Sequence, residues 1–169
     1  DQHDRMSCAH RQAAEGTYVV LASKVRVLRS LCAAFALHPL RLFATAICAQ
    51  KLSQPGIRSR LRHMAYLAEA VDLAREMGQR RLAHVHVHMA NNGAAVALMA
   101  CTFDSRISYS LSIHGSAEFF HVDSWCLKAK AEAAVVVRCI SHFCLSQVMA
   151  WTDPRAWARV HIVHCGVDA

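Results

Sequence analysis

Four short apolar segments, separated by stretches with a helical pattern, restrict what the second half of the chain can fold into. The segments are "AHVHVH" (83–88), "SYSLSI" (108–113), "AAVVVRCI" (133–140) and "RVHIV" (159–163). Helices are predicted between them, at about Gly93–Cys101, Ser124–Ala131 and Ser141–Trp151. Strands that are joined by helices of this length form a parallel sheet with right-handed crossovers. The sequence therefore predicts an α/β domain over about 83–165, with helices on both faces of the sheet.

A section with helical spacing, about 24–78, precedes this domain. Apolar residues recur at helical intervals in "KVRVLRSLCAAFAL" and "PLRLFATAICAQKL", and Pro39 is suited to open the second helix. After a turn at "SQPG", a long amphipathic helix is predicted from Ile57 to about Met77, with Gly78 as its end. Upstream, "TYVVLA" (17–22) has the composition of a strand, and the abrupt start without methionine indicates a fragment.

The helical section is strongly basic. No acidic residue lies between Glu15 and Glu69, and the formal net charge of +7 originates in this interval. Its basic residues are Lys24, Arg26, Arg29, Arg41, Lys51, Arg58, Arg60 and Arg62. Such a surface is attracted to anionic lipid, although a solvated helix face would have the same composition. Nucleic acid is not expected, because the basic residues lack interleaved aromatic residues and a binding motif.

Cysteine usage and hydropathy favour a cytoplasmic protein. The eight cysteines form no C-x-x-C pair and no secretory signal precedes them, so we expect reduced, mostly buried thiols. The most apolar segment, 31–49, contains His38, Pro39 and Arg41, whereas a membrane span needs about 20 predominantly apolar residues. A peripheral position on a membrane remains compatible with the sequence.

Three of the predicted strands end in polar loops: "HMANNG", "HGSAEFF" and "SHF". In open parallel sheets ligands bind outside the carboxyl ends of the strands. His88 ends one strand, and His114 ends the next, where Gly115 would let a ligand approach the backbone and Glu118 follows in the loop. A neutral imidazole there can form a hydrogen bond with a sugar hydroxyl or a phosphate, or it can simply cap the strand.

His84, His86 and His88 alternate along one predicted strand and share one face of the sheet. A zinc site would need a third or fourth ligand and supporting contacts, and no nearby residue has matching spacing. Packed or hydrogen-bonded neutral histidines are the alternative, and no metal is expected.

Four motifs resemble a known family in their order and spacing: "HVHVHMANNGAAVALMA", "YSLSIHGSAEFF", "AAVVVRCISHFCLSQVM" and "ARVHIVHCGVD". They are similar to family-four glycosyltransferases, in particular to the bacterial exopolysaccharide and colanic-acid type, from about Lys24 to the end. The resemblance implies a Rossmann-like sheet that is half of a two-domain GT-B fold. It also implies retaining transfer of a sugar from a nucleotide-sugar donor to a saccharide acceptor, often lipid-linked, without a cofactor.

The resemblance also implies roles for individual residues. His114 would contact the transferred sugar and act catalytically by orientation and charge stabilisation. The substrate-binding positions would be Gly115, Glu118, Phe119, His88, Asn92 and Ser141. The family's donor site uses two glutamates eight positions apart, and the nearest pair in this chain, Glu69 and Glu76, differs from that spacing.

The chain is therefore expected to be a partial, acceptor-side domain (1–169), lacking the nucleotide-sugar domain and inactive alone. In the complete enzyme it would work in the cytoplasm, where a peripheral position on the inner face of the cell membrane is compatible with the sequence. Two alternatives remain: a non-catalytic module that binds anionic membranes, and a metal-binding protein that uses His84, His86 and His88.

Overall fold

The computed structural model describes residues 23–115 and 117–166, so the strand expected at 17–22 lies outside the described residues. Four parallel strands form one sheet in the order β1-β2-β3-β4. Their bounds are β1 His84–Val87, β2 Ser108–Ile113, β3 Val136–Cys139 and β4 Val160–Ile162. The parallel α/β sheet predicted from the alternation of strands and helices is confirmed, and it is Rossmann-like.

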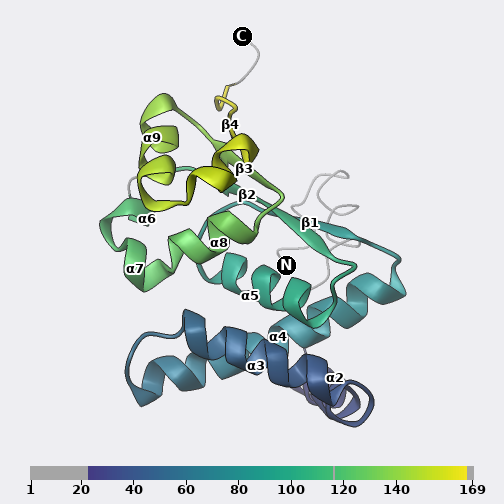
Figure 1. Ribbon diagram of the computed structural model, residues 1–169. Coiled ribbons are helices and arrows are strands. Elements are labelled where there is room, and N and C mark those ends of the chain that lie inside the picture. Colours follow the sequence, from purple (N-terminus) through teal and green to yellow (C-terminus); the bar gives the residue numbers. More distant parts are fainter. Residues whose placement is uncertain (1–22, 116, 167–169) are drawn as a thin grey trace, which may run out of the picture.

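Helices connect successive strands (Figure 1). They are α5 Asn92–Phe103, then α6 Ala117–Phe120, α7 Val122–Trp125 and α8 Leu127–Ala133, and finally α9 His142–Trp151 with the 3₁₀ helix η3 Pro154–Arg159. The single helix expected at 124–131 is divided, because Cys126 adopts a left-handed conformation (φ 50°) between α7 and α8. The thiol of Cys126 donates to the carbonyl of Leu52, which anchors this break to the helical section.

In the part of the chain that the structure describes, helices cover one face of the sheet, whereas we expected them on both. Residues of α5, α8 and α9 share a core with alternate strand residues that include Tyr109, Leu111 and Ile113. Consecutive strand order with crossovers of one hand places all connecting helices on the same side, which explains this arrangement. The opposite face carries polar side chains such as His84, His86 and Arg138.

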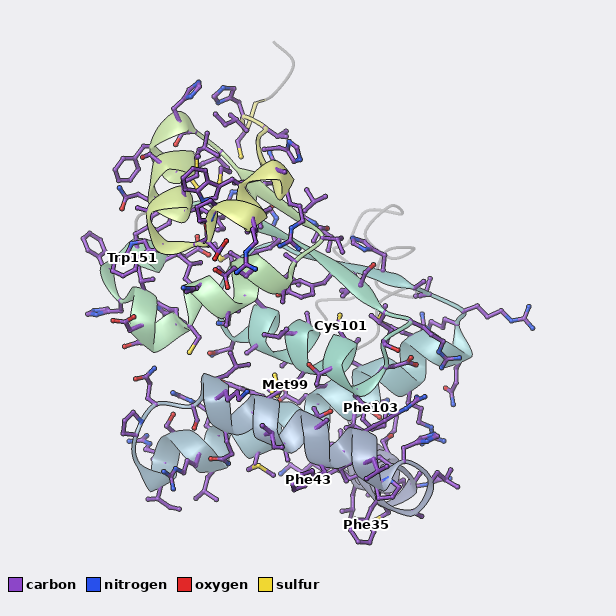
Figure 2. The ribbon with its side chains drawn as sticks, in the orientation of Figure 1. Phe35, Phe43, Met99, Cys101, Phe103 and Trp151 are labelled. Carbon is purple, nitrogen blue, oxygen red and sulfur yellow. The ribbon has the colours of Figure 1, made fainter. Side chains whose placement is uncertain are left out.

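The basic section forms three helices, α2 Lys24–Leu37, α3 Pro39–Leu52 and α4 Ile57–Gln79, close to the predicted bounds. Pro39 stands in the first turn of α3, as expected, while α4 continues past Gly78 by one residue. The three helices form a layer below α5 (Figure 1), and a second core joins them to it. Figure 2 shows Met99 and Phe103 between this layer and the sheet; both are buried.

A buried carboxylate ties α2 to α4. Asp72 is 2% exposed; one oxygen accepts from the hydroxyl of Ser30 at 2.7 Å, and the other accepts from Arg26 Nε at 3.3 Å. Arg75 also donates to the Ser30 hydroxyl. A buried charge needs such partners to offset its desolvation, so this polar contact fixes how the two helices meet.

Replacing Asp72 by alanine should therefore lower the free energy of unfolding by about 2 to 3 kcal/mol, because Ser30 loses its acceptor in a buried position. Lys128→Ala is the control; its ion pair with Glu132 spans 4.0 Å at the surface and should contribute less than about 1 kcal/mol. Denaturant unfolding measures both. Equal effects of the two substitutions would contradict the structural role of Asp72.

Candidate strand-end site

His88 and His114 meet at the carboxyl edge of the sheet. They follow the neighbouring parallel strands β1 and β2, and their ring centroids are 4.2 Å apart. The expectation that both histidines emerge at the same edge is confirmed. Their roles in binding or catalysis remain predictions.

Glu118 holds the two strand-end loops together. One carboxylate oxygen accepts from the backbone N–H of Ala90, which follows β1. The other accepts from the N–H groups of His114 at 3.1 Å and of Gly115 at 3.3 Å, which follow β2. Three amide groups converging on one carboxylate form an anion nest, and the chain's own side chain fills it. Glu118 thus positions the loops through backbone contacts, and its role in binding a substrate stays a prediction.

The two ring nitrogens of His114 have different surroundings. Nε2 is shielded from solvent and makes no hydrogen bond with the described residues, while Nδ1 lies 3.8 Å from the sulfur of Cys165. Desolvation, followed by the charges of His88 and Arg138, lowers the pKa of His114 below its ordinary value. The ring is therefore held neutral near neutral pH, in a state that can donate through one nitrogen and accept through the other.

Lys130 supports the same loops from the helical side. It is 3% exposed, and its ammonium donates to the carbonyl oxygens of Ala90 at 3.1 Å and Asn91 at 2.8 Å. Its own carbonyl accepts from the hydroxyl of Tyr109. Desolvation by burial lowers the pKa of Lys130 to about 8. Ala90 is consequently held at its nitrogen by Glu118 and at its oxygen by Lys130.

Three other residues that were predicted to bind substrate make contacts of their own. Ser141 caps α9 by accepting from the N–H of Cys144, and Phe119 packs edge-to-face on Phe143 with 6.2 Å between centroids. Both contacts stabilise local structure. Asn92 is the first residue of α5 and lines a pocket beside Lys130.

His84 and His86 form a polar ladder with the serines of β2. The two nitrogens of His84 lie 2.9 Å from the hydroxyls of Ser108 and Ser110, and His86 lies between Ser110 and Ser112 at 2.8 and 3.0 Å. Both rings are thus engaged by hydroxyl groups. Across 23–115 and 117–166, no group of three or more His, Cys, Asp or Glu side chains is arranged to hold a metal ion.

Comparison with protein-family models and with curated protein sequences gives no significant match. The motifs quoted above therefore carry the family resemblance by themselves. No single helix among the described residues has the length and hydropathy to cross a membrane; only α2 and α3 taken together meet that criterion, with a bend of 119°.

Sequence reasoning missed Lys130, Arg138 and Cys165. Lys130 follows Leu127 by three positions and precedes Ala131, so helical spacing already placed it on the apolar side of its helix. Arg138 is a single charge in an apolar strand, and it donates to the carbonyl of Val163 at 3.1 Å. Nothing in the sequence indicated the proximity of Cys165 to His114, which lies 51 positions away.

Glu118→Gln should lower the free energy of unfolding by about 1 to 3 kcal/mol, because an amide nitrogen would face backbone N–H donors. It should also accelerate hydrogen exchange at the amides of Ala90, His114 and Gly115. Glu69→Gln is the matched control, since burial raises the pKa of Glu69 and the charged form of that side chain gains little from its surroundings. Unchanged exchange at the three amides would show that Glu118 does not hold the loops.

Proposed function

We propose that this chain is the acceptor-side half of a retaining GT-B glycosyltransferase of bacterial polysaccharide biosynthesis. The observation that carries the proposal is the Nε2 of His114 at the carboxyl edge of a parallel sheet, which has no hydrogen-bond partner among the described residues. A shielded nitrogen without a partner costs about 1 to 3 kcal/mol, which a ligand hydroxyl could recover by bonding to it. The motif resemblance supplies the reaction class.

In this proposal His114 acts by orientation and by stabilising charge that develops on the transferred sugar. His88 packs against its ring, and the N–H of Gly115 is held by Glu118 beside it. The nucleotide-sugar donor would be held by a second domain beyond this chain, with no cofactor and no metal. Activity is therefore proposed for the complete enzyme in the cytoplasm, and the present chain should not transfer sugar alone.

In the complete enzyme, His114→Ala should reduce kcat by about 10²-fold or more while changing the acceptor KM much less, because the imidazole acts where charge develops. His161→Ala is the control, since that histidine is exposed on the edge strand β4. Steady-state kinetics with the correct nucleotide sugar give both constants. An unchanged kcat would reduce His114 to a cap of its strand.

We further propose that the α2–α3 surface contacts an anionic membrane, where a lipid-linked acceptor would be presented. Apolar side chains project from both helices: Phe35 is 72% exposed, Leu40 83% and Phe43 67%. Figure 2 shows Phe35 and Phe43 at the outer edge of the molecule, away from the sheet. Lys24, Arg29 and Arg41 are exposed on the same two helices. Apolar area and positive charge together are what binding to an anionic interface requires.

The chain should bind vesicles containing anionic lipid, and binding should weaken as salt rises, because the screening length falls to about 10 Å at 0.1 M salt. The double variant Phe35→Ser/Phe43→Ser should bind more weakly. Phe120→Ser, which removes an equally exposed ring (76%) from α6, is the control. Sedimentation measures the bound fraction.

Equal binding to neutral and anionic vesicles would exclude the electrostatic contribution. Vesicle binding combined with inactivity of the complete enzyme would favour the non-catalytic membrane module.

A further inference from the structure

A pocket of about 350 Å³ lies between the α3–α4 turn, the start of α5 and the α7–α8 segment. Its volume falls within the range of about 300 to 1,000 Å³ that small-molecule sites occupy. Its polar and aromatic lining comes from Arg62, His63, Asn92, Ser124, Trp125 and Lys130. None of its lining residues is His88 or His114, and Asn92 is its one residue that the sequence predicted to bind substrate.

The two fully charged residues that line this pocket are both cations, while the carboxylate of Glu118 lies on the other side of Ala90. Arg62 and Lys130 line it, no lining residue is acidic, and neither cation forms an ion pair with a carboxylate of the described residues. Lys130 is almost completely buried and uses two of its three N–H groups on backbone carbonyls. A buried ammonium without a salt bridge is costly: desolvation lowers the pKa of Lys130, and the nearby charge of Glu118 offsets this only in part.

The start of α5 adds to this positive potential. A helix N-terminus carries partial positive charge and is stabilised by acidic side chains, but α5 has none in its first turn. The ammonium of Lys130 instead bonds to the carbonyls of Ala90 and Asn91, immediately before the helix. A negative charge stabilises the N-terminus of a helix, whereas a cation such as Lys130 is unfavourable there. An anion in the pocket would offset both charges.

Trp125 indicates what else the ligand carries. Its ring lines the pocket, 5.9 Å from the ammonium of Lys130. Aromatic faces pack against the apolar faces of sugar rings, while cations bind phosphate groups. We propose that this pocket binds the phosphate-bearing end of a saccharide through Arg62, Lys130 and Trp125. This inference deepens the proposed function, on which it rests, because it gives the acceptor an anionic group.

The pocket is connected to His114 through one residue. Ala90 is fully buried; its carbonyl accepts from Lys130 on the pocket side, and its N–H donates to Glu118, which also accepts from the N–H of His114. An anion that contacts Lys130 in the pocket would therefore be separated by Ala90 alone from Glu118, the carboxylate that bonds the N–H of His114. Acceptor binding and the placement of His114 share this loop.

Binding of hexose 1-phosphate to the chain tests the proposal. Free hexose tests the contribution of the sugar ring, and inorganic phosphate tests that of the anionic group. Calorimetry at low, fixed ionic strength should show that hexose 1-phosphate binds more tightly than either half. Arg62→Gln should weaken its binding about tenfold, as expected for one charge-assisted hydrogen bond. Arg60→Gln, which removes the same charge from an exposed position on α4 outside the pocket, should change it less than about twofold.

Lys130→Met should abolish binding while keeping most of the side-chain volume. Arg62→Gln keeps the test decisive if the methionine variant does not fold. Equal loss in the Arg60 and Arg62 variants, or equal binding of free hexose, would overturn the proposal. Vesicles of phosphatidic acid form a second arm. If Arg62→Gln weakens vesicle binding but leaves hexose 1-phosphate binding unchanged, the pocket takes a lipid headgroup and the saccharide assignment is wrong.

These measurements need neither donor nor turnover, so their failure is distinguishable from failure of the proposed transferase activity. If hexose 1-phosphate does not bind, the kinetic test of His114→Ala would still be valid for the proposed transferase activity. Conversely, the complete enzyme could be inactive and still bind hexose 1-phosphate through Arg62. That result would contradict the proposed transferase activity but not the proposed binding pocket.

Discussion

Helix α5 is the element on which the rest of the structure depends, because it is buried from two sides. Ala94 and Ala97 pack in the core beneath the sheet, whereas Met99, Ala100 and Phe103 pack in the core formed with α2, α3 and α4. The small residues let both layers approach the helix closely. The basic helices are therefore part of one packed unit with the sheet, and their outward surface has a fixed orientation relative to the strand ends.

Burial of α5 also determines the electrostatics at its start. The helix begins at the carboxyl edge of β1, so its positive end lies beside the strand-end loops. Glu118 and Lys130 approach the loop before α5 from opposite sides and hold Ala90 between them. The carboxylate occupies the nest of amides next to His114, and the ammonium leaves positive potential on the pocket side. One loop thus separates a neutral imidazole from a cationic pocket.

Much of the fold could be predicted from the sequence because periodicity reflects local geometry. The four strands, the three helices of the basic section and the strand-end position of His88 and His114 followed from alternation, helical spacing and turn residues. The break at Cys126 could not be predicted in this way, since it depends on a thiol reaching the carbonyl of Leu52, 74 positions earlier. Helices were expected on both faces of the sheet, but among the described residues they cover one face, because the strands follow one another in consecutive order.

The sequence by itself determined which residue types stand at the strand ends, that positive charge is concentrated before residue 69, and that a parallel sheet forms. Only the tertiary structure decided what those residues do to one another. Glu118 became a loop clamp because three amides converge on it, and Lys130 became a buried cation because α8 packs against the start of α5. Such outcomes depend on distances between segments far apart in the chain, and local sequence patterns do not encode those distances.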